Sequence, residues 1–151
     1  MTRRLQALLL IFAGLAAVTA FSYVTRPREK VPWRTDFSAA LQEAKQTGKP
    51  MLLDFSAKWC GPCQDMRRTT WSSAKVASAL GDYVPVQIDV DARPDLAHQF
   101  NAEAIPHLVV LDSSGNLVKW TEGELPPDEF LQWLGPKPAA AATTQPITAV
   151  R

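Results

Sequence analysis

The chain of 151 residues carries a formal net charge of +1 and only two cysteines. Its charge is divided unevenly: residues 1–30 carry five Lys or Arg against one Glu, a net +4, and residues 31–135 carry nine against fourteen Asp or Glu, a net −5. The acidic part lacks the basic patches that nucleic-acid binding depends on, and its length suffices for one domain but not for two.

The first predicted element is an apolar helix. Arg3 and Arg4 precede Leu5–Val24, an uncharged run of 20 residues that is long enough to cross a membrane as a helix. The run includes Val18-Thr19-Ala20, small residues of the kind that precede a signal-peptidase cut. We favour an uncleaved anchor, because the apolar character continues past Ala20. Either interpretation places the domain on the extracytoplasmic side of a membrane, in the periplasm, or secreted if the chain is cut. A buried core helix is disfavoured, since such helices usually keep a polar face.

Two segments flank the predicted domain. Residues 26–32 contain two prolines and four charges, which predicts a short linker after an anchor or signal segment at residues 1–25. Residues 136–151 contain three prolines within eleven residues together with four consecutive alanines. This composition predicts a disordered tail, to which we assign no function. The domain itself is expected over residues 33–135.

Helices and strands alternate within the domain. Thr35 or Asp36 can cap a helix that Gly48 would end. Apolar runs predict strands at residues 51–57, 83–90, 108–111 and 117–120. Further helices are expected at residues 60–70, 73–80, 94–100 and 127–134. The last two strands would pair as a hairpin. This order predicts an α/β fold with a mixed central sheet flanked by helices.

The two cysteines, Cys60 and Cys63, lie where the first predicted strand joins the next helix. A sulfur at the first turn of a helix lies among unpaired backbone N–H groups and at the positive end of the helix dipole, which lowers the pKa of a thiol. Cys60 is therefore the expected nucleophile. Cys63, nearly one turn later, would face inward and resolve a mixed disulfide. The pair predicts a redox-active disulfide, which needs no organic cofactor and no metal.

Three neighbours would complete this site. Pro62 has no N–H to offer, and the first helical turn is where that loss matters least, while Gly61 lets the backbone of a partner approach closely. Asp54 lies within the apolar run before the cysteines. If buried, its carboxyl would have a raised pKa and could accept the proton of the resolving cysteine.

Two structural roles for the cysteines are disfavoured. A disulfide that closes a four-residue loop removes little entropy from the unfolded chain. A structural zinc site would need both cysteines with His98 and His107, whose spacing matches no common zinc-finger pattern.

The segment Trp59-Cys60-Gly61-Pro62-Cys63, with Asp54 before it and Ile105-Pro106 after it, resembles the thioredoxin family over residues 49–134. Gly48-Lys49-Pro50, Thr69-Thr70-Trp71-Ser72 and the apolar N-terminal segment are more similar to membrane-anchored or periplasmic members that resemble the C-terminal domain of the thiol reductase DsbD.

The resemblance implies a thioredoxin fold in which the Ile105–Pro106 bond is cis and lies against the Cys60 thiol. It also implies that Ile105 and Pro106, with Gly61 and Pro62, bind the substrate peptide. We interpret Trp59 as an aromatic residue at the rim that covers the disulfide, rather than as ordinary packing, because an amphipathic ring suits a contact surface.

Three positions depart from the family pattern. Ser56 stands where many cytosolic thioredoxins have Trp, and Gln87 stands where they often have Lys near the buried acid. His107 replaces the more common Thr. An imidazolium there would favour a Cys60 thiolate, but we expect His107 to be partly exposed and without a catalytic part.

We therefore predict a monomeric thiol-disulfide oxidoreductase that reduces disulfides of extracytoplasmic proteins. The resemblance implies recharging by a transmembrane electron donor such as a DsbD-like reductase. Three alternatives stay open. An oxidase or isomerase would use the same residues at a higher reduction potential. A copper-handling chaperone would use Cys60, Cys63 and His107 as ligands. A non-catalytic binding module would keep the fold for peptide docking alone.

Overall fold

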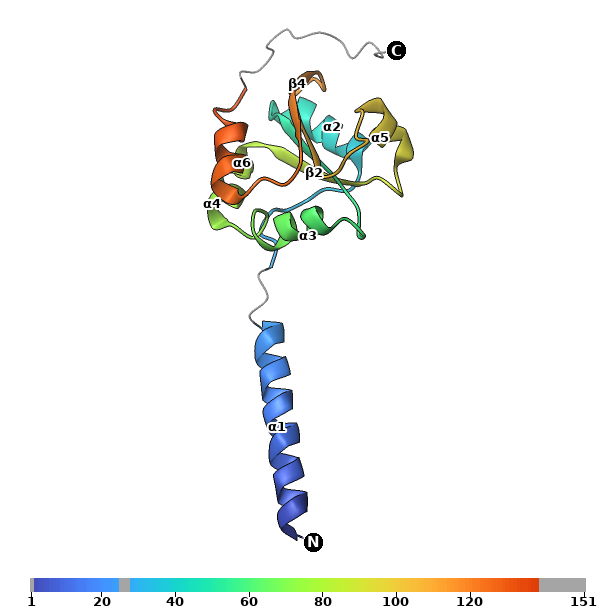
Figure 1. The fold of residues 1–151 in the computed structure, drawn as a ribbon. Coiled ribbons are helices and arrows are strands. Elements are labelled where there is room, and N and C mark those ends of the chain that lie inside the picture. Colours follow the sequence, from blue (N-terminus) through green and yellow to red (C-terminus); the bar gives the residue numbers. More distant parts are fainter. Residues whose placement is uncertain (1, 25–27, 139–151) are drawn as a thin grey trace.

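The computed structural model describes residues 2–24 and 28–138. An N-terminal helix precedes a domain of alternating helices and strands (Figure 1). The elements in chain order are α1 (Thr2–Val24), α2 (Phe37–Thr47), β1 (Met51–Ser56), α3 (Gly61–Arg68), α4 (Ala74–Ala79), the 3₁₀ turn η1 (Leu80–Asp82), β2 (Val84–Asp89), α5 (Pro94–Gln99), β3 (His107–Leu111), β4 (Leu117–Glu122) and α6 (Pro127–Leu134).

The four strands form one mixed sheet in the order β2-β1-β3-β4. Strand β1 is parallel to β2 and antiparallel to β3, and β4 pairs antiparallel with β3. The predicted mixed sheet is therefore confirmed. Because β1 and β3 run in opposite directions, the end of β1 lies beside the start of β3, where Phe55 is opposite His107. The segment before β3 and the cysteines after β1 are thereby brought to the same edge of the sheet.

The sheet has a packed layer on each face. Side chains alternate along β1, so that Leu53 and Phe55 pack with residues of α2 and α5, whereas Leu52 packs with residues of α3, α4 and α6. Figure 1 shows α4 and α6 on one side of the domain, and α2 and α5 on the other. All six residues of β1 are buried, because both faces of the strand are covered. Asp54 follows the alternation of Leu52 and faces the layer that contains α3.

Helix α2 begins and ends as the sequence predicts. Asp36 is its N-cap, and its carboxylate accepts a hydrogen bond from the backbone N–H of Ala39 at 3.0 Å. Gly48 follows the last turn in a left-handed conformation, with φ of +67°, which glycine adopts without strain.

The segment before α2 is attached to the domain. The backbone N–H of Lys30 donates to the carbonyl of Trp71 at 2.8 Å, and Val31 is buried. The ring of Trp33 meets that of Trp71 edge-on, and Arg34 forms an isolated parallel bridge with Val86 of β2. The contacts of the domain thus begin within the segment that was predicted to be a linker. Residues 26 and 27 of that segment, and residues 139–151 of the predicted tail, lie outside the described residues.

Helix α1 has apolar side chains that are largely exposed, for example Leu10 at 74% and Phe12 at 69%. In the described ranges 2–24 and 28–138, no helix has the combined length and apolar character required to cross a membrane. The membrane or signal segment expected from the sequence stays a prediction.

Phe130 should be a large contributor to the stability of the domain. It is fully buried on α6, and its ring lies 5.0 Å from that of Trp71. We expect Phe130→Ala to lower the free energy of unfolding by about 3–5 kcal/mol, because the cavity left behind cannot be refilled by the rigid layer around it. Guanidinium titration measures the change. The matched control is Gln132→Ala on the exposed side of the same helix, which should change it by less than about 0.5 kcal/mol. Equal losses in the two variants would contradict this packing of α6.

Candidate active site

Cys60 is the N-cap residue of α3, and Gly61 and Pro62 are the first two residues of the helix. The Sγ atom of Cys60 accepts a hydrogen bond from the backbone N–H of Cys63 at 3.1 Å. This N–H belongs to the first turn, whose N–H groups have no partner within the helix. Once the disulfide is reduced, the same N–H and the positive end of the helix favour a thiolate at Cys60. Cys60 thus lies at the start of the helix, as the sequence predicts, and its role as the nucleophile stays a prediction.

Cys60 and Cys63 are joined by a disulfide, so the described form is the oxidised one. Both residues are buried, with 4% and 7% of their surface exposed, and they pack with Ala57, Val90 and Ile105. Cys63 was expected to face inward, and Cys60 is buried as well. Exposure therefore does not distinguish the two sulfurs. The roles expected for them, nucleophile for Cys60 and resolving residue for Cys63, depend on the place of Cys60 at the helix cap. Between them, Gly61 and Pro62 are exposed.

The loop before β3 lies against the disulfide. The Ile105–Pro106 peptide bond is cis, as the family resemblance implies. The carbonyl oxygen of Ile105 is 3.7 Å from Sγ of Cys60, and Pro106 is buried. On the other side of this loop, the N–H of Gly123 donates to the carbonyl of Pro106 at 2.9 Å. Ile105 and Cys60, which are 45 positions apart in the chain, thus meet at one sulfur. Ile105 is half-buried, whereas Pro106 is buried.

Asp54 is buried within β1, with 2% of its surface exposed. Burial raises the pKa of its carboxyl to about 6 from the ordinary 3.8, while the side-chain amide of Gln87, which donates to Oδ2 at 3.0 Å, acts in the opposite direction. More weakly, the charge of Glu29 raises this pKa and that of Arg67 lowers it. The burial and the raised pKa expected from the sequence are both confirmed. A carboxyl that titrates near pH 6 can accept and release a proton close to neutral pH.

Trp59 is 68% exposed at the surface next to Cys60, which agrees with a residue at the rim. Its indole N–H donates to a carboxylate oxygen of Asp91 at 2.9 Å. The sequence analysis missed Asp91, and no local pattern points to it, since the two residues are 32 positions apart. It also missed Arg67, which lies one helical turn after Cys63 and on the same side of α3, so helical spacing would have found it.

The expectation for His107 is wrong. It was expected to be partly exposed, but 2% of its surface is exposed. Strand β3 begins at His107, one residue earlier than predicted, so the side chain follows the alternation of the strand into the layer that contains Phe55. Its ring stacks on that of Trp120, with centroids 5.4 Å apart.

Burial lowers the pKa of the His107 imidazole, and the carboxylate of Glu122, 3.4 Å from Nδ1, acts in the opposite direction. The neutral form is favoured near neutral pH, so His107 does not supply the positive charge that was considered for tuning Cys60. In the described part of the chain, no group of three or more His, Cys, Asp or Glu side chains comes together as metal ligands. The copper-handling alternative therefore gains no support from the positions of its three candidate ligands.

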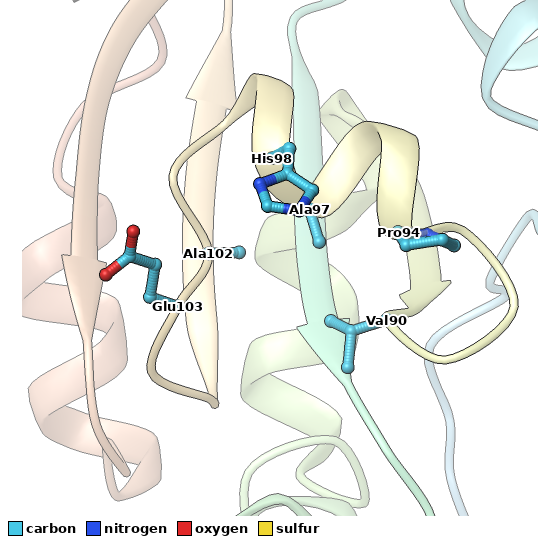
Figure 2. Close-up of a pocket in the computed structure, with 6 residues that line it drawn as sticks. All are labelled: Val90, Pro94, Ala97, His98, Ala102 and Glu103. Atoms are coloured by element: carbon cyan, nitrogen blue, oxygen red, sulfur yellow. The ribbon is translucent and has the colours of Figure 1, made fainter. Parts of the chain in front are cut away.

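Two hollows lie near the disulfide. Figure 2 shows the smaller one, of about 140 Å³, which is lined by Val90, Pro94, Ala97, His98, Ala102 and Glu103. It adjoins the disulfide through Val90, which packs against both cysteines. The second hollow, of about 300 Å³, includes the polar residues Ser56 and Gln87 among its lining residues. Because Gln87 bonds to Asp54, this second hollow brings space for water close to the buried acid.

Comparisons with known proteins agree with this geometry. A family model described as thioredoxin-like matches residues 32–113. The chain is 36% identical over 92 residues to the thiol:disulfide interchange protein DsbD of Ralstonia nicotianae, covering 58% of this chain and 15% of that protein. It is 34% identical over 73 residues to an H-type thioredoxin of Oryza sativa subsp. indica, covering 48% of this chain and 57% of that protein. It thus spans less than two thirds of either relative.

Among solved structures, the crystal structure of the oxidised C-terminal domain of DsbD from Neisseria meningitidis is similar, with a TM-score of 0.55 and 26% sequence identity. The alignment covers 67% of this chain and 95% of that domain. The likeness therefore extends over almost the whole of the compared domain.

Asp54 should make the oxidised protein less stable as pH rises. Because its pKa is about 6 when folded and close to 3.8 when unfolded, the folded state holds the proton more tightly. Stability should fall between about pH 4 and pH 6 by about 3 kcal/mol and then level off. Asp54→Asn keeps the shape without the charge, so above pH 6 it should be more stable than the parent by up to this amount, and equal to it near pH 4.

Guanidinium unfolding of the oxidised protein at several pH values measures the effect. The exposed Asp128→Asn serves as the matched control and should leave the pH dependence unchanged. A parent protein and an Asp54→Asn variant with parallel stability curves from pH 4 to pH 8 would contradict a buried, proton-binding carboxyl.

Proposed function

Because this chain belongs to the thioredoxin-like family, we propose that it is a thiol-disulfide oxidoreductase that reduces disulfides of other proteins through Cys60 and Cys63. One observation carries the proposal: Sγ of Cys60 accepts the N–H of Cys63 at the start of α3 and lies 3.7 Å from the carbonyl of Ile105. A sulfur held in this way is stabilised as a thiolate and has backbone polar groups beside it with which a substrate peptide can pair.

The proposed cycle transfers two electrons to the substrate. The Cys60 thiolate attacks one sulfur of a substrate disulfide, so that a Cys60–substrate disulfide forms and the other substrate sulfur leaves as a thiolate. Cys63 then loses its proton to Asp54, directly or through water, and attacks Sγ of Cys60. The Cys60–Cys63 disulfide forms, and the second substrate sulfur leaves. The proton held by Asp54 passes to solvent or to a departing thiolate, and the reduced substrate is released.

Trp59, Gly61 and Pro62 would form the surface against which the substrate lies. All three are exposed, and Trp59 is fixed by its hydrogen bond to Asp91. Ile105 and Pro106 would provide the opposite wall, with the Ile105 backbone pairing with the substrate. This surface favours an extended peptide, because only an extended backbone presents free N–H and C=O groups to a partner.

We infer that the domain works on the extracytoplasmic side of a membrane and is attached there through α1. The support is the uncharged run Leu5–Val24 after two arginines, and the exposure of apolar side chains along it, such as Leu15 at 64%. The similarity to DsbD suggests the class of partner that would recharge the disulfide, a transmembrane thiol reductase. The similarity to plant thioredoxins gives no support for an extracytoplasmic location.

Trapping should identify the substrates. Cys63→Ala removes the resolving sulfur, so mixed disulfides through Cys60 should accumulate in cells and disappear on treatment with dithiothreitol. Affinity purification and mass spectrometry would name the attached proteins, which we expect to be extracytoplasmic. The control Cys60→Ala/Cys63→Ala should trap none. Capture by Cys60→Ala instead of Cys63→Ala would reverse the proposed order of attack, and exclusively cytosolic partners would contradict the proposed location.

The reduction potential tests the direction of the reaction. Gly61, Pro62 and Ile105 resemble reducing members of the family, so we expect a potential close to that of thioredoxins, about −270 mV. Equilibration of the full-length chain with glutathione, followed by alkylation of free thiols, measures it, with Cys60→Ser as the control that cannot form the couple. A potential near −120 mV, typical of a strong oxidant, would assign the protein as an oxidase instead.

A further inference from the structure

The polar contacts of Asp54 lead away from the cysteines to the segment before α2. Gln87 Nε2 donates to Asp54 Oδ2 at 3.0 Å, and Arg67 Nη2 donates to Gln87 Oε1 at 3.4 Å. Arg67 Nε in turn lies 3.3 Å from Oε1 of Glu29. Two side chains, Gln87 of β2 and Arg67 of α3, therefore connect the buried acid of β1 with the carboxylate of Glu29 outside the sheet.

The backbone of the same segment holds Gln87 as well. The N–H of Gln87 donates to the carbonyl of Arg34 at 2.8 Å, and the N–H of Arg34 donates to the carbonyl of Pro85 at 2.9 Å. Next to Glu29, the N–H of Lys30 is bonded to the carbonyl of Trp71. The segment is thus fixed to the domain on both sides of the chain of contacts, and Glu29 is not placed by its side chain alone.

The amide of Gln87 lies between Arg67 and Asp54. An amide has an oxygen that accepts and a nitrogen that donates, whereas a guanidinium only donates. Arg67 and the carboxylate of Asp54 therefore favour the same orientation, in which the oxygen of Gln87 faces α3 and the nitrogen faces the carboxyl. The reverse orientation would place the amide oxygen against the carboxylate of Asp54, where two acceptors repel each other.

We propose that Glu29 and Arg67 are positioning residues for proton transfer at Asp54: Arg67 orients the amide of Gln87 on the carboxyl, and Glu29 holds Arg67. This inference rests on the proposed function. It makes the segment that follows α1 part of the catalytic apparatus rather than a passive connection. Arg67 reaches the carboxyl of Asp54 through the amide of Gln87, and the charges of both Arg67 and Glu29 also act on that carboxyl.

The larger of the two hollows gives this arrangement a route for the proton. It measures about 300 Å³ and is lined by Ser56, Gln87 and Arg67 among others, so it has room for several water molecules. In the resolving step, the Cys63 thiol gives its proton to the Asp54 carboxylate, and the carboxyl then releases it to water in this hollow. Asp54 returns to its ionised form, and no oxidant or reductant beyond the substrate is required.

The two outer residues have opposite electrostatic effects on Asp54. Within the described ranges, the charged groups that act on the carboxyl are Glu29, on the segment before α2, and Arg67, on α3. The negative charge of Glu29 raises the pKa of Asp54, and the positive charge of Arg67 lowers it. Removal of one charge or the other should therefore move the titration in opposite directions, which a general loss of packing would not do.

The test is a set of variants of the full-length oxidised chain, labelled with ¹³C at the aspartate carboxyl carbons and titrated by NMR. Glu29→Gln should lower the pKa of Asp54 and Arg67→Met should raise it, each by about half a pH unit, as expected for partly screened charges. The pKa of Asp54 in the double variant should lie between the values of the two single variants. Arg67→Lys keeps a charged donor, so the pKa of Asp54 in this variant should lie closer to the parent value than in Arg67→Met. Arg68→Met removes the neighbouring arginine, which is paired with Asp65, and serves as the matched control without a shift.

A second measurement follows the resolving step itself. Near pH 6, the rate at which a preformed Cys60–substrate disulfide is released should be about 1.5-fold faster in Glu29→Gln and about twofold slower in Arg67→Met than in the parent, because the ionised fraction of Asp54 changes by these factors. The two variants should therefore differ from each other about threefold. Shifts of the same sign in both variants, or an equal shift in Arg68→Met, would overturn the inference. Since the titration needs no activity, a parent protein that reduces no disulfide would refute the proposed function separately.

Discussion

The burial of β1 between two packed layers is the constraint on which the rest of the structure depends. All six residues of the strand are buried, and the chain leaves it directly toward Cys60. The strand therefore fixes where α3 begins, and its antiparallel pairing with β3 fixes where Ile105 and Pro106 lie. The same burial raises the pKa of Asp54, so one feature of packing both places Cys60 and perturbs the acid within the strand. The disulfide itself contributes little to this framework, because it closes a very short loop.

Burial of an ionisable carboxyl in a central strand lowers stability, and a core of this kind accepts such a residue where function requires it. Replacement of Asp54 by an apolar residue would fit the alternation of Leu52 better. The carboxyl is nevertheless given a partner, since Gln87 on the parallel neighbour β2 stands opposite it in register. A neutral amide satisfies one oxygen without neutralising the charge, so the carboxyl keeps a pKa near 6. A lysine at the same position would have added a positive charge and lowered the pKa further.

Much of this arrangement was predictable because its signals are local. The cap at Asp36, the glycine at 48, the apolar run of β1 and the cysteine pair each depend on a few neighbouring residues. The cis bond before Pro106 followed only from family resemblance. His107 was misplaced because the predicted strand began at Leu108, whereas His107 is the first strand residue and is paired with Phe55, on a face of the sheet that is covered. The contact between Arg67 and Gln87 joins residues 20 positions apart on a helix and a strand, and no periodicity in the sequence encodes such a pairing.

The resolving step gives a reason for a positive charge at Arg67. When Cys63 gives its proton to Asp54, the negative charge moves from the carboxylate to the Cys63 thiolate, and because each charge disfavours the ionisation of the other group, the two titrate as a pair. Arg67 is the cation that acts on Asp54 within the described ranges, and it stands near enough to act without forming a direct ion pair with the carboxyl. A direct pair would hold Asp54 ionised and weaken it as a base. In the proposed mechanism, placement of the cation one residue away, behind Gln87, with Glu29 to offset part of its charge, leaves the carboxyl of Asp54 able to take the proton.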